Sequence, residues 1–115
     1  MAFVHLDYDL VHELASLLEE DFPILVNTFI ENSNQLLTKM PLSLDEGDIK
    51  TFIRDVHSLK GSSRNLGAER LANLCLNYEI LANHGKIDCI DREFTEIKTE
   101  LDNVSETLTN YSASD

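Results

Sequence analysis

The chain has 115 residues, with 9 Lys and Arg against 21 Asp and Glu, and a formal net charge of −12. This charge argues against general binding to nucleic acids or anionic membranes, because both need a positive surface. The length predicts one domain over 1–115, and no apolar run approaches the roughly 18 residues of a membrane span. The first residues lack a signal-peptide pattern, so we expect a cytoplasmic protein.

Apolar residues recur three and four positions apart through most of the chain, which predicts five helices. The first helix is expected over 7–20. The second begins at Asp21, with Pro23 in its first turn, and Pro41 is expected to break or bend it. The remaining predicted elements are a closing segment over 42–47, a third helix over 48–67, a fourth over 68–84, a connection over 86–91, a fifth helix to about residue 110, and a frayed tail over 111–115.

No segment alternates between apolar and polar residues for long enough to predict a strand. Short loops between long amphipathic helices predict an all-α fold, an antiparallel four-helix bundle with an additional N-terminal helix. The turn at 65–68 makes the third and fourth helices an antiparallel hairpin, which places His57 opposite 77–79. Glu79 is therefore a candidate for orienting the imidazole, since accepting an N–H bond would fix its tautomer. The alternative is that Glu79 lies on a solvated helix face.

Cations and a histidine share one flank of the third helix. Spacings of four, three, four and three define this flank, which we call the basic strip: Lys50, Arg54, His57, Gly61 and Arg64. Lys60 lies on its border, one turn after the histidine. These cations would favour a neutral, nucleophilic imidazole and would stabilise an anion placed near it. The plainer alternatives are a histidine at the core boundary and a helix surface with ordinary ion pairs.

Gly61 is unusual because it lies inside a helical pattern and is followed by Ser62 and Ser63. A glycine there costs about 1 kcal/mol relative to alanine. It either allows another backbone to pack closely or leaves room for a group that must reach His57.

The other chemically versatile residues do not form a recognisable site. His5, His12 and His84 belong to different predicted elements, so no metal site is expected from them. Cys75 lies on an apolar stripe and is expected in the core, whereas the role of Cys89 is open. The chain has no motif for binding ATP phosphates, and two cysteines do not make a disulfide framework.

The run His57-Ser58-Leu59-Lys60-Gly61-Ser62-Ser63, followed by Leu66-Gly67-Ala68, resembles the motif of histidine-containing phosphotransfer (HPt) domains. The resemblance implies that His57 accepts and donates a phosphoryl group, that Lys60 stabilises the phosphate, and that Gly61 leaves room for the partner. Lys50, Arg54 and Arg64 would then contact the partner or the phosphate. Some members hold the histidine with a glutamine from the next helix, and Glu79 stands at the aligned position here.

The resemblance also implies partners. These are a response-regulator receiver domain, which would supply the reacting aspartate and Mg²⁺, and a hybrid sensor kinase upstream. The chain would need no cofactor of its own and would act as a monomeric phosphorelay intermediate without ATP-dependent kinase activity. The main alternative is a non-catalytic helical adaptor that binds a partner through the basic strip. A kinase dimerisation segment is disfavoured, because Ser58 follows His57 where an acid is usual.

Overall fold

The computed structural model describes residues 5–87 and 91–113. Every regular element in these ranges is helical, as the periodicity predicted. The elements are α1 (Tyr8–Leu18), the 3₁₀ helix η1 (Glu19–Asp21), α2 (Phe22–Asp45), α3 (Ile49–Asn65), α4 (Glu69–Asn83) and α5 (Arg92–Ala113).

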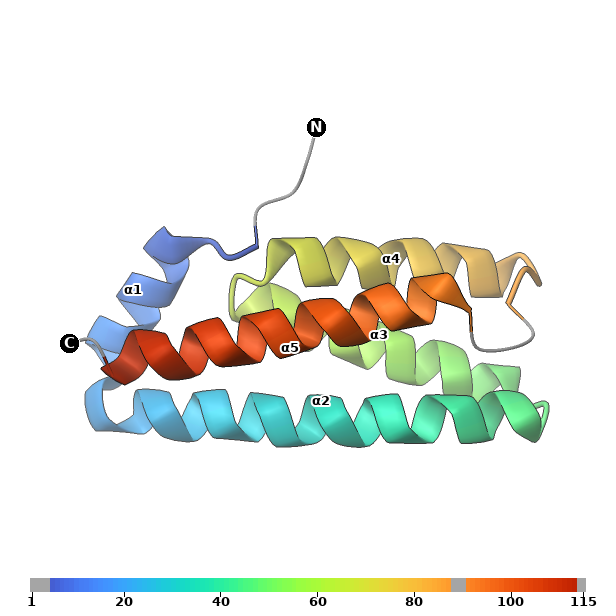
Figure 1. Cartoon of the computed structure of the whole chain (residues 1–115), viewed down its shortest axis with the longest axis horizontal. Helices are drawn as coiled ribbons and strands as arrows, with labels where there is room; N and C mark the ends of the chain where they lie inside the picture. The colour runs from blue at the N-terminus through green and yellow to red at the C-terminus, as the bar shows by residue number, and fades with distance from the viewer. Residues whose placement is uncertain (1–4, 88–90, 114–115) are drawn as a thin grey trace.

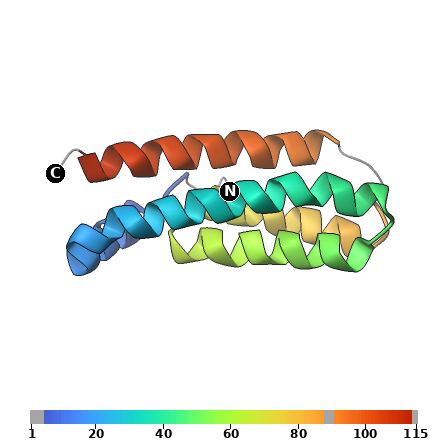
Figure 2. The ribbon, with the colours of Figure 1, turned by 90° about the horizontal axis from the view of Figure 1, so that it is seen from below.

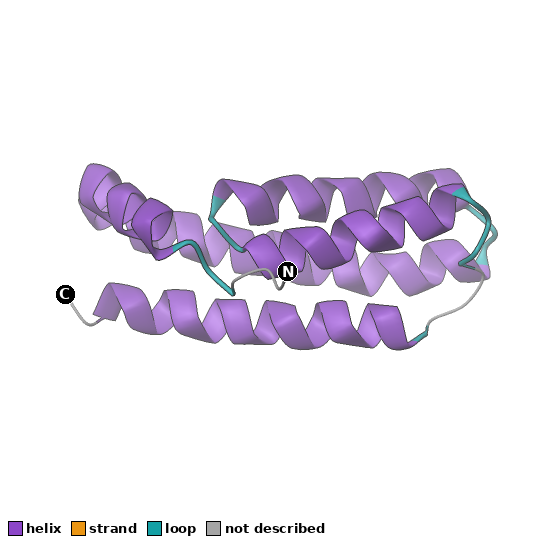
Figure 3. Cartoon of the chain, turned by 90° about the horizontal axis from the view of Figure 1, so that it is seen from above, coloured by secondary structure: helices purple, strands orange, loops and turns teal. Residues whose placement is uncertain are grey.

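Helices α2 to α5 run lengthwise along the molecule, and α1 is inclined to them at the end where α5 finishes (Figure 1). The packed pairs are α2 with α3, α3 with α4, α4 with α5 and α5 with α2, so the four long helices close a ring. In a second view α2 lies between α5 and α3 (Figure 2), and the connections lie at the ends of the helices (Figure 3). The prediction of a four-helix bundle with an additional N-terminal helix is confirmed.

Apolar side chains from all four long helices fill the bundle. In α3, Phe52, Val56 and Leu59 are fully buried. The ring of Tyr78 meets Phe52 edge-on at 5.5 Å between centroids and meets Phe94 at 6.4 Å, which joins α3, α4 and α5 through aromatic contacts. These contacts give α3 a rigid base. One apolar residue of α1, Leu17, lies outside this core and is 72% exposed.

The turn between α3 and α4 is closed by two backbone hydrogen bonds. The amide of Gly67 donates to the carbonyl of Arg64 at 3.0 Å, and that of Ala68 donates to Ser63 at 2.8 Å. In this pattern the residue just beyond the C-cap of the helix adopts a positive φ, and Gly67 has a φ of +75°. The carbonyl of Gly67 also accepts from the amide of Asp7 at 2.7 Å, which attaches the segment before α1 to the turn.

Pro41 does not end α2, which continues through it to Asp45. Proline has no N–H, so the carbonyl of Leu37 loses its helical hydrogen bond at this point. Met40 and Leu44, on either side of Pro41, are both buried in the core. Tertiary packing therefore outweighs the local preference to break.

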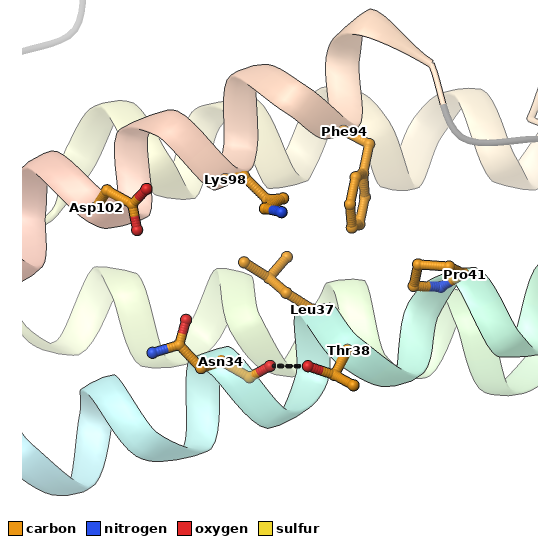
Figure 4. Close-up of a pocket in the computed structure, with 7 residues that line it drawn as sticks. All are labelled: Asn34, Leu37, Thr38, Pro41, Phe94, Lys98 and Asp102. Atoms are coloured by element: carbon orange, nitrogen blue, oxygen red, sulfur yellow. Dashed lines mark hydrogen bonds between the residues drawn. The ribbon is translucent and has the colours of Figure 1, made fainter.

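Beside Pro41, a groove of about 310 Å³ separates α2 from α5. Figure 4 shows side chains from both helices facing it: Asn34, Leu37, Thr38, Pro41, Phe94, Lys98 and Asp102. The Thr38 hydroxyl donates to the carbonyl of Asn34 at 2.9 Å within its own helix. Neither α3 nor α4 contributes a lining residue, so this groove is separate from the basic strip.

The prediction of a frayed tail over 111–115 is wrong for 111–113, because α5 extends to Ala113, and 114–115 lie outside the described residues. The Tyr111 hydroxyl lies 2.6 Å from Nδ1 of His12, and its ring meets Phe22 edge-on at 6.2 Å. A second attachment lies before α1, where His5 Nδ1 is 2.7 Å from the buried carboxylate of Glu100. Side chains from the first helix and from the segment before it therefore hold both to α5.

Gly67→Ala is expected to destabilise the fold more than the same change at Gly47. Both glycines follow a helix with the same hydrogen-bond pattern and with φ of +75° and +73°. Alanine in this conformation costs roughly 1–2 kcal/mol. At Gly67 its Cβ would also lie 3.1 Å from Cβ of Asp7, whereas at Gly47 nothing lies within 4 Å.

Urea denaturation of both variants measures the difference, which we expect to be about 1 kcal/mol or more from overpacking. Equal losses would show that the contact between Gly67 and Asp7 adds nothing to the stability of the turn.

Candidate functional site

Local capping explains why α3 begins where it does. Asp48 stands before the helix, and its side chain accepts from the backbone amide of Thr51 at 3.2 Å and from the Thr51 hydroxyl at 2.7 Å. Arg64 lies in the last turn, where a cation offsets the negative end of the helix dipole. The helix between these ends carries the basic strip on its outer flank.

His57 projects from the middle of α3, and its side chain is 64% exposed. Nδ1 lies 2.9 Å from Oε2 of Glu79 on α4, as the hairpin register predicted. No described residue hydrogen-bonds to the other ring nitrogen, Nε2. The imidazole is therefore anchored at one nitrogen and open at the other.

Lys60, which the sequence places on the border of the strip, is largely buried in the structure. Its side chain is only 11% exposed, and Nζ donates to Oε1 of Glu79 at 2.7 Å. Sequence reasoning placed Glu79 beside His57 but missed this ion pair. The signal was present, because Lys60 lies one turn after His57 and so reaches the same part of α4.

Glu79 is thus mostly enclosed, with 16% of its side chain exposed, and each of its oxygens faces one donor. Burial acts to raise the pKa of its carboxyl group. Hydrogen bonds from Lys60 and His57 outweigh burial and hold that pKa below its ordinary value. Glu79 is therefore a carboxylate at neutral pH, and its place on a solvated face is excluded.

The remaining cations of the strip, Lys50, Arg54 and Arg64, are exposed and make no ion pair with a described residue. Asp55, the nearest acid on α3, does not neutralise them. Its buried carboxylate faces α2, where Nζ of Lys39 lies 3.8 Å away. The strip therefore stays locally positive on a strongly negative protein.

Gly61 lies on the same flank, one turn after His57. A Cβ added to it would meet no atom within 4 Å. Packing inside the chain therefore gives no reason for a glycine here, which removes one of the two interpretations of its sequence position. The space beside the imidazole is therefore open.

Two shallow grooves border the strip. The groove toward α2 measures about 180 Å³ and includes Ser62 and Asn65, whereas the groove toward α4 measures about 170 Å³ and includes Arg64 and Leu76. Sequence periodicity did not reveal these grooves, because they depend on how the neighbouring helices are spaced.

The other candidate residues lie apart from the strip. His5 and His12 contact α5, and His84 bonds the carbonyl of Ile80 on its own helix. Burial raises the pKa of the Cys75 thiol to about 12, so this thiol stays protonated in the core. Cys89 lies outside the described residues.

Two further findings concern the described ranges. They contain no group of three or more His, Cys, Asp or Glu side chains arranged to hold a metal ion. No helix within them is long and apolar enough to cross a membrane.

A model of the Hpt domain family matches residues 24–107, which is most of the chain and includes the whole α3–α4 hairpin. The chain belongs to the Hpt domain family. The crystal structure of histidine-containing phosphotransfer protein B from Pseudomonas aeruginosa PAO1 is similar to this Hpt domain. The TM-score is 0.87 at 27% identity, and 96% of each chain is covered.

This Hpt domain is also similar to two plant proteins from Arabidopsis thaliana. Histidine-containing phosphotransfer protein 5 is 32% identical over 103 residues, which cover 77% of this chain and 66% of that protein. Histidine-containing phosphotransfer protein 1 is 32% identical over 78 residues, which cover 66% of this chain and 51% of that protein. The chain therefore spans about half to two thirds of the length of these relatives.

The lowered pKa of Glu79 predicts an acid-sensitive contribution to stability. Because the folded state binds this proton less tightly than the unfolded chain, ionised Glu79 stabilises the fold above the unfolded pKa, about 4.3. That stability is lost as the pH falls through the lower, folded pKa. Glu79→Gln should cost roughly 1–2 kcal/mol at pH 7, and the difference from wild type should shrink toward pH 3.

Urea denaturation across this pH range measures the difference. Glu106→Gln removes an equal charge from an exposed position on α5 and should cost little at any pH. A loss for Glu79→Gln that does not change with pH would contradict the assigned ionisation.

Proposed function

We propose that this chain is a phosphorelay intermediate. It accepts a phosphoryl group on His57 from an aspartyl-phosphate receiver domain and passes it to, or back from, a response regulator. The observation that carries this proposal is the imidazole held at Nδ1 by Glu79, with Nε2 free on the basic strip. Membership of the Hpt domain family and similarity to proteins named for histidine-containing phosphotransfer support it.

His57 is the nucleophile in this proposal. Phosphoryl transfer depends mainly on positioning and on neutralising charge, and α3 supplies both. Glu79 sets the direction of the ring, and Lys60 stands one turn away to stabilise the phosphoryl oxygens. Arg54 and Arg64 on the exposed strip would contact the acidic pocket of a receiver or the phosphate itself.

Lys50 extends the same positive flank toward the start of α3 and is assigned a partner contact. The receiver would bring the reacting aspartate and Mg²⁺, so the chain needs no cofactor of its own. A hybrid sensor kinase would stand upstream, and the chain would have no ATP-dependent kinase activity. One chain contains His57, Lys60 and Glu79 together, which supports action as a monomer. We place this action in the cytoplasm.

A transfer assay with His57→Gln tests the proposal. Wild type and variant are incubated with a panel of phosphorylated receiver domains, and acid-labile, base-stable label is followed. Label on wild type and none on the variant is the expected result, because glutamine has no nucleophilic ring nitrogen. A folded wild type that takes no label from any receiver would favour the adaptor that binds without chemistry.

Substitutions at Gly61 distinguish an effect on the stability of the fold from an effect on phosphoryl transfer. Gly61→Ala should raise the free energy of unfolding by about 1 kcal/mol, because the site is helical and the added Cβ meets no atom. Gly61→Gln should also remain folded, yet its long side chain should block a receiver from reaching His57. Urea denaturation and the transfer assay are run on both variants. Undiminished transfer by Gly61→Gln would contradict the assigned clearance.

A further inference from the structure

Glu79 does something that an amide at the same position could not do. Its two oxygens each accept one hydrogen bond, from His57 Nδ1 at 2.9 Å and from Lys60 Nζ at 2.7 Å. A glutamine is neutral and offers one acceptor oxygen and a nitrogen that only donates, so it cannot accept from these two donors on separate oxygens as Glu79 does. The acid at this position therefore links His57 and Lys60 through one negative charge.

The charge of Glu79 also decides where the imidazole proton lies. An ionised carboxylate has no hydrogen to give, so the hydrogen in its bond with His57 belongs to Nδ1. The lone pair then lies on Nε2, the nitrogen on the exposed side of the ring. The reacting nitrogen is selected by a neighbour that does not itself touch the phosphoryl group.

If the proposed function is correct, the transfer step needs no proton to move. The Nε2 lone pair forms the N–P bond while the P–O bond to the receiver's aspartate breaks, and its electron pair leaves with that carboxylate. The ring keeps its hydrogen on Nδ1 and becomes cationic, opposite the Glu79 carboxylate. In the reverse step the N–P electron pair returns to Nε2, and the ring leaves as neutral imidazole.

Two consequences of Glu79 act in the same direction. Its charge holds the proton on Nδ1 of the phosphorylated ring, and a cationic ring releases a phosphoryl group more readily than a neutral one. Its other oxygen pairs with Lys60, the buried cation one turn from His57, and so partly neutralises the charge of Lys60. Both effects weaken retention of the phosphoryl group.

We propose that Glu79 is a positioning residue that shortens the lifetime of phosphorylated His57, so that His57 passes the phosphoryl group on quickly and does not retain it. This inference rests on the proposed function, because it concerns the lifetime of phosphorylated His57. Glutamine at this position would keep a hydrogen bond to Nδ1, but without a negative charge it would hold Lys60 less strongly and leave that cation more available to the phosphoryl oxygens. It would also stop holding the ring in its cationic form.

The test compares wild type, Glu79→Gln and the charge control Glu106→Gln after phosphorylation, either by a phosphorylated receiver or by phosphoramidate. Glu79→Gln should lengthen the half-life of phosphorylated His57 at pH 7.5 about tenfold, which corresponds to about 1.4 kcal/mol in the barrier. Glu106→Gln should leave it unchanged. Lys60→Met, which retains the carboxylate but removes the cation, should shorten it.

A spectroscopic signature separates this role from a merely structural one. In ¹⁵N spectra of the phosphorylated protein, Nδ1 of His57 should remain protonated at pH 7.5 in wild type and lose its proton in Glu79→Gln. Equal half-lives and equal spectra in labelled wild type and Glu79→Gln would overturn the inference and leave the proposed function standing. Absence of label on His57 of folded wild type from either donor would overturn both.

Discussion

The turn at Gly67 fixes how α3 and α4 slide past each other, and the geometry at His57 depends on that register. Successive residues of a helix are separated by about 100° of rotation, so a slip of one position would turn Glu79 away from α3. The turn is held by backbone hydrogen bonds and by the segment before α1, which donates to the carbonyl of Gly67. The position of the Glu79 carboxylate is thus set by the turn at Gly67, about three helical turns away.

Around α3, the acidic side chains on the inner side are paired, whereas the basic side chains on the outer flank are exposed. The acids that face α3 from inside, or lie within it, are engaged with Lys60, His57 or Lys39. The cations on the outer flank of α3 have no such partners among the described residues. An acidic chain therefore presents a small positive face without a positive net charge, which suits selection of one kind of acidic surface over general attraction to polyanions.

Much of the fold follows from local sequence signals. Helical periodicity and turn chemistry predicted the bundle, and counting from the turn brought Glu79 to His57. Interactions between segments that are far apart in the sequence were harder to predict. Pro41 is helical because Met40 and Leu44 are anchored in the core, and α5 is longer because Tyr111 meets α1. The burial of Lys60 depends on the width of the α3–α4 interface, which periodicity does not encode.

The roles assigned to His57, Lys60 and Gly61 are of a different kind. They came from the motif and from its resemblance to a family, because a geometry at rest does not show a reaction. The structure adds the physical state of each group: a ring anchored at one nitrogen, an ammonium already paired and a glycine with open space around it. These states make the roles testable one residue at a time.

The exposure of the His57 imidazole has a consequence for a phosphoryl group bound to it. The His57 side chain is 64% exposed and no described segment covers it, so between encounters a phosphoryl group on Nε2 would stand in bulk water. Exclusion of solvent would not slow hydrolysis there, so its rate would depend on the ring as leaving group and on whether a base can activate a water molecule. Glu79 is the nearest carboxylate, and both of its oxygens are already taken by donors. Glu79 would therefore supply no base for hydrolysis, and the short lifetime inferred for the phosphoryl group would come from the cationic ring that it leaves.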